Sequence, residues 1–356
     1  MKQRILIVNS GGDCPGMNAV IRAIVKRADQ ESGWEIIGSI NGFDGILSEP
    51  LNLLALDEKL VSGIHVEGGT ILMTNNKRSP FNYPVKQADG SFINEDLTDK
   101  LIYNLKVLNF DAVIHIGGNE SHKISQLLYE KGVNIIGIPK TINNDLSSTD
   151  YSFGFQTAAQ VATEAVDKLV TTATSHNRIL ILEVMGRNAG WIALHAAIGG
   201  GADVCLIPEI PFSMEKVVEK LKSRYSRDGR GFANIVVAEG AFIKGTKTKT
   251  VQGGAISRDI SSQLKKLNFE ADIRETILGH LQRGGTPMAF DRILATELGV
   301  KAFELVMEKK YGNIAIHQNS KLTHIELKNV IDQYNKVDLS HNLIHTAKGI
   351  GISFGD

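Results

Sequence analysis

The sequence predicts an α/β protein built from doubly wound, mostly parallel sheets. Short apolar runs alternate with helical patterns along the chain, and this rhythm is typical of parallel strands joined by crossover helices. The 35 glycines, with 42% hydrophobic and only 6% aromatic residues, suit many tight connections between strands and helices. With 356 residues the chain has room for two ordinary domains, or for one large domain with a lobe.

The expected elements follow one another along the chain. Apolar runs predict strands at residues 4–9, 35–39, 112–116 and 135–138, and helical periodicity predicts helices at 15–29, 98–108 and 121–130. A second α/β unit is expected from about residue 155, with helices at 156–174 and 191–198 and strands at 178–184, 204–207 and 234–238. In the segment 83–94, Asp89-Gly90 between extended residues predicts a hairpin, which we interpret as a surface insertion.

The bulk composition argues against several classes of protein. Lys and Arg together number 39, as do Asp and Glu, so no net charge favours nucleic acid or an anionic membrane. Cys14 and Cys205 lie far apart in sequence, so we expect no disulfide and a reducing cytoplasm. The apolar run that starts at Ile5 is too short for a signal-peptide core, and no apolar run reaches the ~18 residues of a membrane span. These features predict a soluble, cytoplasmic protein.

The most informative stretch is Pro139-Lys140-Thr141-Ile142-Asn143-Asn144-Asp145, which follows the apolar run 133–138. In open α/β sheets, ligands bind beyond the carboxyl ends of the strands. A buried strand that ends in hydroxyl, amide, ammonium and carboxylate groups therefore predicts a binding crevice. Asn143 supplies an amide where a proton acceptor would be expected.

Two glycine-rich turns each join a predicted strand to a predicted helix. They are Ser10-Gly11-Gly12-Asp13-Cys14-Pro15-Gly16-Met17-Asn18, with Pro15 suited to the first helical turn, and Ile116-Gly117-Gly118-Asn119-Glu120-Ser121. Neither has the Walker or the G-x-G-x-x-G pattern. Each alone is equally well explained as a tight connection or as a phosphate cradle at a helix N-terminus. Together with the 139–145 loop at one sheet edge, they favour a phosphate site.

Basic residues gather in two further segments. Met185-Gly186-Arg187 follows the strand 178–184, and Arg274, His280 and Arg283 lie in a glycine-containing run that ends at Pro287. A single Arg is most simply a solvated loop residue. The combination of Arg, His and Gly instead favours a grip on a phosphate monoester through charge-assisted hydrogen bonds.

Taken together, these segments resemble the 6-phosphofructokinase family, which phosphorylates fructose 6-phosphate at its 1-hydroxyl with ATP or pyrophosphate. The shared motifs are 11–18, Gly68-Gly69-Thr70, 117–121, 139–145, 150–155, 185–187, Glu239, 279–287, 291–294 and 351–356. The resemblance implies two α/β domains with the active site between them. Residues 1–154 and 282–332 would form the larger, donor-binding domain, and residues 155–281 and 333–356 the smaller, sugar-phosphate-binding domain.

The resemblance also implies roles for individual residues on the sugar side. Fructose 6-phosphate would be held by Thr141, Met185, Gly186, Arg187, Glu239, His280 and Arg283. Arg178 and Arg274 are similar to two arginines that a neighbouring subunit lends to the 6-phosphate, which implies a homodimer or homotetramer. The catalytic positions would be Thr141, Asn143, Asp145 and Arg187.

On the donor side, the resemblance implies binding by Gly11, Gly12, Asn76, Arg78, Gly118, Glu120, Ser121 and Lys140, with Mg²⁺ as cofactor at Asn119 and Glu120. Several of these positions depart from the family pattern. Asn119 replaces the Asp that serves Mg²⁺, and Asn143 replaces the Asp that accepts the sugar proton. Asn76 replaces a donor-binding Arg, for which Arg78 is a candidate stand-in.

The space available beside the second turn bears on whether the donor is ATP or pyrophosphate. Glu120 and Lys140 would narrow the space for a nucleotide, which favours pyrophosphate over ATP. An ion pair between Lys140 and Glu120 that merely fills the turn is the alternative.

Asn143 cannot take up a proton, and a general base is worth roughly 10²–10⁴-fold in rate. Asp145 could act as a replacement base and Glu120 as a replacement metal ligand. Three hypotheses remain open: a slow or re-tooled phosphotransferase, a non-catalytic sugar-phosphate binder, and a chain into which Asn119 or Asn143 was introduced deliberately.

Overall fold

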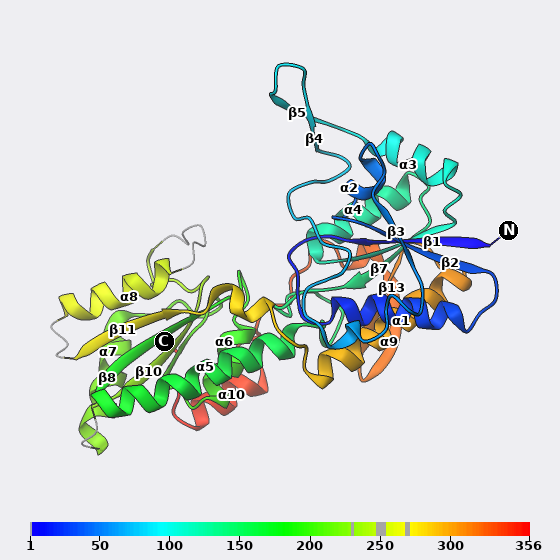
Figure 1. Ribbon diagram of the computed structural model, residues 1–356. Helices are drawn as coiled ribbons and strands as arrows, with labels where there is room; N and C mark the ends of the chain where they lie inside the picture. The colour runs from blue at the N-terminus through cyan, green and yellow to red at the C-terminus, as the bar shows by residue number, and fades with distance from the viewer. Residues whose placement is uncertain (1, 229–230, 247–253, 268–270) are drawn as a thin grey trace. The chain divides into compact units, whose positions relative to one another are not determined.

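The computed structural model describes residues 2–228, 231–246, 254–267 and 271–356 (Figure 1). The chain folds into two compact units. Unit 1 comprises Met1–Thr141, Leu146–Gly154 and Arg283–Tyr334, and unit 2 comprises Ile142–Asp145, Phe155–Gln282 and Asn335–Asp356. Both units are built on largely parallel sheets, which confirms the predicted fold class.

Unit 1 is built on a seven-stranded sheet in the order β13-β12-β7-β6-β1-β2-β3. The five central strands run parallel, and β13 and β3 pair antiparallel at the two edges. The strands are β1 (Gln3–Asn9), β2 (Trp34–Ser39), β3 (Leu53–Leu56), β6 (Ala112–Gly117), β7 (Ile135–Pro139), β12 (Asn313–Gln318) and β13 (Lys321–Glu326). The central strands are continuous apolar runs because helices cover both faces of the sheet.

The helices of unit 1 are α1 (Met17–Asp29), α2 (Asp44–Leu47), α3 (Thr98–Val107), α4 (Asn119–Glu130) and α9 (Ala289–Met307), with short 3-10 turns at Ile64–Val66 and Leu327–Asn329. Leu6 and Val8 share a core cluster with Leu101 of α3 and Leu128 of α4. Strand side chains alternate between faces, so Ile5 and Ile7 point to the other side. Figure 1 shows α1 and α9 packed side by side in this unit.

In unit 1 the start of the first helix differs from the prediction, and the predicted hairpin is present. The first helix begins at Met17 rather than residue 15, because Gly16 adopts a left-handed conformation (φ 109°) as its N-cap and Pro15 lies in the preceding turn. The predicted hairpin is confirmed: β4 (Tyr83–Lys86) and β5 (Phe92–Glu95) pair antiparallel and project from unit 1 (Figure 1).

Unit 2 is built on a four-stranded parallel sheet in the order β11-β8-β10-β9. The strands are β8 (Arg178–Val184), β9 (Val204–Leu206), β10 (Ala233–Ala238) and β11 (Asp272–Ile277). The helices are α5 (Phe155–His176), α6 (Trp191–Gly199), α7 (Met214–Asp228), α8 (Ala255–Lys266) and α10 (Asn342–Gly349), and a 3-10 turn spans Gly279–Arg283. Ile179, Ile181 and Ile235 of the strands share a core with Val217 and Leu221 of α7.

The two units differ at three places from the domain boundaries expected from the sequence, namely residues 142–145, Gln282 and the last return to unit 2. Gln282, expected in the larger domain, belongs to unit 2, where its Oε1 accepts from the N–H of Met185. Residues 142–145 belong to unit 2, because Asn335 donates hydrogen bonds to the carbonyl oxygens of Asn144 and Asp145. The last return to unit 2 occurs at residue 335 rather than 333, since Tyr334 still forms a β-bridge with Leu146 of unit 1. None of the described helices has both the length and the apolarity needed to cross a membrane.

Candidate active site

The two glycine-rich turns and the 139–145 loop begin at the carboxyl ends of adjacent strands. β1, β6 and β7 are parallel neighbours, with Asn9 opposite Ile116 and Ile116 opposite Ile138. The backbone N–H of Lys140 donates to the carbonyl of Gly117 at 2.8 Å, which joins the second turn to the loop. The structure therefore brings these predicted phosphate-binding segments to one edge of the sheet of unit 1.

The first turn is also joined to the loop that carries Asn76. The N–H of Gly11 donates to the carbonyl of Asn75 at 2.9 Å, and the Thr74 hydroxyl donates to the carbonyl of Gly11 at 2.7 Å. Gly11 has a φ of 83°, a conformation that favours glycine. Asn76 is exposed beside this junction.

Two cationic side chains lie directly against the first turn. The buried Lys140 donates from Nζ to the carbonyl of Gly12, and a Cβ placed on Gly11 would lie 3.1 Å from that nitrogen. Arg283 donates from Nη1 to the carbonyl of Asp13 at 2.9 Å, and a Cβ on Gly12 would lie 2.9 Å from Nη1. The glycines thus admit two positive groups to the first turn, and this local positive charge favours an anion. Arg283, expected on the sugar side, contacts the first glycine-rich turn of unit 1 in this structure.

Arg78, the candidate stand-in for the missing donor-binding Arg, is held by a buried carboxylate. Its Nη1 donates to Asp44 Oδ2 at 2.7 Å, and Asp44 raises the pKa of the guanidinium. The same oxygen accepts hydrogen bonds from Asn41 Nδ2 at 2.7 Å and Asn75 Nδ2 at 3.1 Å. Arg78 is therefore anchored to α2, although 43% of its side chain remains exposed.

The second turn places Asn119 at the first position of α4, with both ends of its amide bonded to the backbone. Nδ2 donates to the carbonyl of Gln333 at 3.1 Å, and Oδ1 accepts from the N–H of Asp332 at 3.2 Å. An ionised carboxylate could accept the second bond but could not donate the first. The Asn119 amide can therefore make both hydrogen bonds to the backbone of residues 332–333, which a carboxylate could not.

Glu120, Gly118 and Ser121 complete the second turn. The Glu120 carboxylate contacts Lys123 Nζ at 3.0 Å and accepts from the Tyr334 hydroxyl at 3.2 Å, and 67% of the side chain is exposed. The ion pair observed for Glu120 is therefore with Lys123, whereas the Lys140 ammonium donates to Gly12. A Cβ on Gly117 would lie 2.2 Å from Ser121 Cβ, so glycine allows α4 to approach the strand end that leads into Gly118.

The predicted magnesium position does not fit a metal as it is arranged here. Both polar atoms of Asn119 are used by the backbone of residues 332–333, and Glu120 is paired with Lys123. No group of three or more His, Cys, Asp or Glu side chains in the described part of the chain could hold a metal ion.

Two buried histidines that the sequence analysis did not consider lie close to the glycine-rich turns, His115 on β6 and His122 on α4. His115 Nε2 lies 2.7 Å from the Ser10 hydroxyl, and its Nδ1 lies 2.7 Å from the Ser125 hydroxyl. Burial lowers the pKa of His115 well below its ordinary value and lowers the pKa of His122 to about 4. Both rings are therefore neutral at neutral pH. A histidine inside the apolar run of β6 was the signal available in the sequence.

The loop after β7 presents its amide and its carboxylate close together. Thr141, in unit 1, accepts a hydrogen bond at its carbonyl from the Ser152 hydroxyl at 2.8 Å. In unit 2, Asn143 Nδ2 donates to Asp145 Oδ2 at 3.4 Å. Asn144, between them, has a φ of 51°, and both asparagines are buried.

In unit 2, several residues expected to bind the sugar phosphate lie at the carboxyl ends of β8, β10 and β11. Glu239 Oε1 accepts from the N–H groups of Gly186 at 3.2 Å and Arg187 at 2.9 Å, so Glu239 fixes the turn that carries Met185 and exposes the Arg187 side chain. His280 is exposed just beyond β11, the neighbouring strand.

Gln282 is a residue that the sequence analysis missed in this edge of unit 2. Its Oε1 accepts from the N–H of Met185 at 3.2 Å, and the side chain is fully buried. A neutral polar residue inside the basic run was the only signal in the sequence.

Arg178 and Arg274 lie toward the opposite end of the same sheet. Arg178 is the first residue of β8, about 20 Å from its carboxyl end at the usual strand rise. It donates from Nε to Asp272 Oδ2 at 2.5 Å, and Arg274 Nη1 also bonds the Asp272 carboxylate. Arg274 lies on the edge strand β11, which the sequence analysis did not predict. Within one copy of unit 2, Arg178 does not join the residues at the carboxyl edge.

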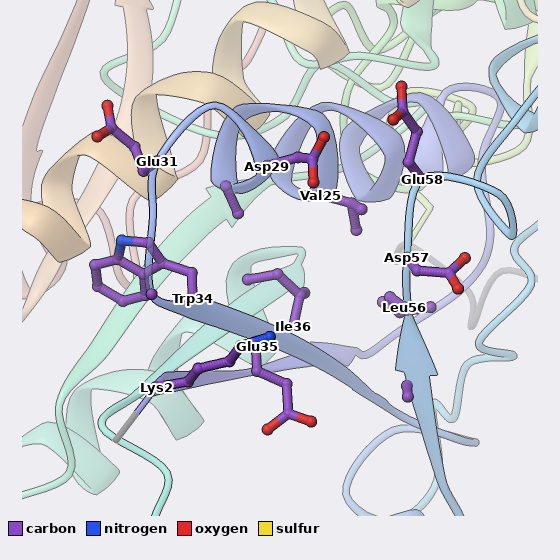
Figure 2. A pocket seen from close by; sticks show the side chains of 13 residues that line it. Lys2, Val25, Asp29, Glu31, Trp34, Glu35, Ile36, Leu56, Asp57 and Glu58 are labelled. Atoms are coloured by element: carbon purple, nitrogen blue, oxygen red, sulfur yellow. The ribbon is translucent and has the colours of Figure 1, made fainter.

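A separate pocket of about 370 Å³ lies beside α1 and β2 in unit 1 (Figure 2). Its charged lining is mostly acidic and includes Asp29, Glu31, Glu35, Asp57 and Glu58, with Lys2 as the opposite charge. Because carboxylates repel phosphate groups, this pocket is not a candidate for the substrates of a phosphate site.

Comparison with known proteins identifies the family. Residues 4–306 match the family model described as Phosphofructokinase. The chain belongs to the phosphofructokinase family. This finding confirms the resemblance inferred from the glycine-rich turns and the 139–145 loop.

Relatives within the phosphofructokinase family match the chain along its length. It is 45% identical over 364 residues to "ATP-dependent 6-phosphofructokinase 2" of Clostridium perfringens, covering 99% of both chains. It is 43% identical over 358 residues to "ATP-dependent 6-phosphofructokinase" of Chloroflexus aurantiacus, covering 100% of this chain and 98% of that one.

Solved phosphofructokinases share the fold. The Saccharomyces cerevisiae phosphofructokinase matches with a TM-score of 0.79 and 31% identity, over 92% of this chain and 45% of that chain. A pyrophosphate-dependent phosphofructokinase from Marinobacter aquaeolei matches with a TM-score of 0.78 over 99% of this chain and 88% of that chain. At 23% identity, this second likeness concerns the fold alone.

Proposed function

We propose that this chain is a 6-phosphofructokinase that transfers a phosphoryl group from ATP to the 1-hydroxyl of fructose 6-phosphate. The proposal depends above all on the edge of unit 1, where two glycine-rich turns and the 139–145 loop meet with Lys140 and Arg283 against the first turn. Phosphoryl transfer depends chiefly on positioning and charge stabilisation, which such an edge can supply.

ATP is favoured over pyrophosphate for two reasons. The steric argument for pyrophosphate required Glu120 to narrow the donor space, but its carboxylate is bonded to Lys123 and Tyr334 and is largely exposed. The relatives at 45% and 43% identity are named ATP-dependent. Pyrophosphate is the second candidate donor, because the Lys140 ammonium beside Gly11 would suit a compact anion.

Separate residues would bind the donor, bind the sugar phosphate and accept the proton. Lys140 and Arg283 would neutralise donor phosphates at the first turn. Arg187, with the backbone that Glu239 fixes, would hold the sugar phosphate together with His280. Asp145, whose Oδ2 accepts a hydrogen bond from the Asn143 amide, would accept the proton of the 1-hydroxyl.

Mg²⁺ keeps several waters and is usually held by one or two carboxylates plus substrate phosphates. Here Asn119 is occupied by the backbone and Glu120 is paired with Lys123, so the donor phosphates would have to hold most of the ion's coordination sphere.

We also propose a homodimer or homotetramer in which Arg178 and Arg274 serve the 6-phosphate in a neighbouring copy, since Arg178 lies far from the carboxyl edge of its own sheet. The two cysteines are free and buried, in keeping with a reducing compartment such as the cytoplasm.

A non-catalytic sugar-phosphate binder is the second candidate function. It is favoured by the amides at 119 and 143, because neither can ionise to bind a metal or accept a proton.

A coupled assay on fructose 6-phosphate with ATP or pyrophosphate, beside an Asp145→Asn variant, separates these candidates. We expect turnover with ATP, and a fall in kcat of about 10²–10⁴-fold in the variant with little change in KM. Greater turnover with pyrophosphate would reverse the donor assignment. Calorimetric binding of fructose 6-phosphate without donor binding and without turnover would indicate the binder instead.

A further inference from the structure

The chain leaves unit 1 for the last time through residues 332–335, which we call the crossing segment. Its unit 1 end is held by the first turn of α4. Asn119 bonds the backbone of Asp332 and Gln333 at 3.2 and 3.1 Å, and Lys123 Nζ contacts Asp332 Oδ1 at 2.6 Å. The Tyr334 hydroxyl adds a bond to Glu120 at 3.2 Å.

The unit 2 end of the crossing segment is bonded to the turn that carries the proposed base. Asn335 donates from its backbone N–H to the carbonyl of Asp145 at 3.0 Å, and from Nδ2 to the carbonyl of Asn144 at 3.0 Å. The carbonyl of Asn335 accepts from Trp191 Nε1 at 2.9 Å. Asn335 therefore holds two successive carbonyls of this turn while its own carbonyl is fixed by a side chain of α6.

The turn needs such support because Asn144 has a φ of 51°, in the left-handed region that a non-glycine residue adopts at a cost. A residue in this conformation persists when its surroundings fix it. The two bonds from Asn335 hold the carbonyl groups of the two peptides that flank the Cα of Asp145, and so limit where the Asp145 carboxylate can lie.

We propose that Asn335 is a positioning residue for Asp145, and that the crossing segment couples the Asn119–Glu120 turn to the 143–145 turn. This inference rests on the proposed function. Tyr334 and Asn335 are consecutive, so a shift of the backbone at the α4 end moves the residue that holds the base. Asn119 then acts as a clasp for the segment, and its amide is required because it donates and accepts at once.

Asn335→Ala tests the positioning role, because it removes the Nδ2 donor and keeps the backbone N–H. The matched control is Asn104→Ala, which likewise removes an amide that donates to a distant backbone carbonyl, that of Ile46 at 2.7 Å. We expect Asn335→Ala to lower kcat about ten-fold or more, with KM for fructose 6-phosphate nearly unchanged, and to move the acidic limb of the kcat–pH profile. Asn104→Ala should change neither.

The outcomes separate the inference from the function on which it rests. Turnover in the wild type with an unchanged kcat and pH profile in Asn335→Ala overturns the positioning role alone. Absence of turnover in the wild type with both donors overturns the proposed function and this inference together. If both variants lose activity only in proportion to a loss of stability in urea, the contacts serve folding and the positioning role fails.

A double-mutant cycle tests the coupling. Asn119→Ala and Asn335→Ala are combined, and the losses in kcat are compared. Coupling predicts that the double variant loses less than the product of the two single losses, because either change already releases the segment. Losses that multiply would mean that the two ends act independently, which would overturn the coupling.

Discussion

Asn143 combines two opposite properties for a phosphotransferase. Its amide cannot accept the proton of a sugar hydroxyl, yet it donates to the Asp145 carboxylate at 3.4 Å. The amide therefore helps to hold the carboxylate of Asp145, the proposed base, in place. The position is therefore compatible with catalysis through Asp145.

Replacing Asn143 by Asp would place two carboxyl groups side by side. Like charges raise the pKa of one member of such a pair, so the second proton leaves only at higher pH. We expect kcat of Asn143→Asp to exceed that of the wild type by about ten-fold or more, with a gain that grows as the pH rises. The coupled assay at several pH values measures this. No gain at any pH would contradict this expectation and would mean that a carboxylate at position 143 adds nothing to the base that Asp145 provides.

Asn119→Asp should destabilise unit 1 even though it would restore the carboxylate usual in the family. The change replaces the hydrogen bond to Gln333 with a contact between two acceptors, at a cost of about 1–3 kcal/mol. Urea unfolding followed by fluorescence of Trp34, in a Trp191→Phe background, reports the loss. Asn94→Asp on the exposed strand β5 is the control and should stay within about 0.5 kcal/mol. Equal stability of the two variants would show that the clasp contributes nothing.

Residue types in the candidate site could be chosen from the sequence, but their partners could not. Asn119 bonds a carbonyl 214 residues away, and Arg283 bonds one 270 residues away. Such pairs depend on how strands are ordered in the sheet, which no local pattern encodes. The contacts of Arg283 with the first turn and of Asn119 with residues 332–333 could therefore be found only from the structure.

At the scale of elements, the parallel strands were the most predictable part. β8 has the predicted bounds, because a buried parallel strand is a continuous apolar run. β11 was missed because an edge strand carries polar side chains, here Arg274 and Glu275. α9 was missed because its apolar residues, among them Leu294, Leu298 and Phe303, do not form one simple stripe.

The buried histidines of β6 and α4, His115 and His122, should make the free energy of unfolding of unit 1 depend on pH in the acid range. Burial lowers the pKa of His122 to about 4, below the value of about 6.5 expected in the unfolded chain. The unfolded state therefore gains a proton first as the pH falls, and stability present above about pH 6.5 is lost toward pH 4. The loss reaches about 3 kcal/mol for this residue, and His115 adds to it.

Urea unfolding at neutral and mildly acidic pH, followed by Trp34, measures this dependence. His122→Leu should reduce the difference between the two pH values, because it removes one titrating group. His345→Gln, at an exposed position of α10, is the control and should leave the difference unchanged. An unchanged difference in His122→Leu would contradict the assignment of the acid sensitivity to this ring.

At the scale of the whole molecule, the arginines of β8 and β11 predict complementation between copies. The double variant Arg178→Ala, Arg274→Ala and the single variant His280→Ala should each raise KM for fructose 6-phosphate. If the arginines serve a neighbour, mixed oligomers contain some sites that receive intact arginines and an intact histidine. Refolding the two variants together should therefore recover activity that neither has alone. Activity equal to the average of the separate variants would place all these residues in one copy.

The order of strands in unit 1 has a consequence for biosynthesis. β12 pairs with β7, yet 173 residues separate the end of β7 at Pro139 from the start of β12 at Asn313, including nearly all of unit 2. On the ribosome, β7 therefore waits with one side unpaired until residue 318 has emerged, long after the sheet of unit 2 could close. Translation would complete the strands of the unit 2 sheet before those of the unit 1 sheet, and chaperones that shield open strand edges would act on the earlier half of the nascent chain.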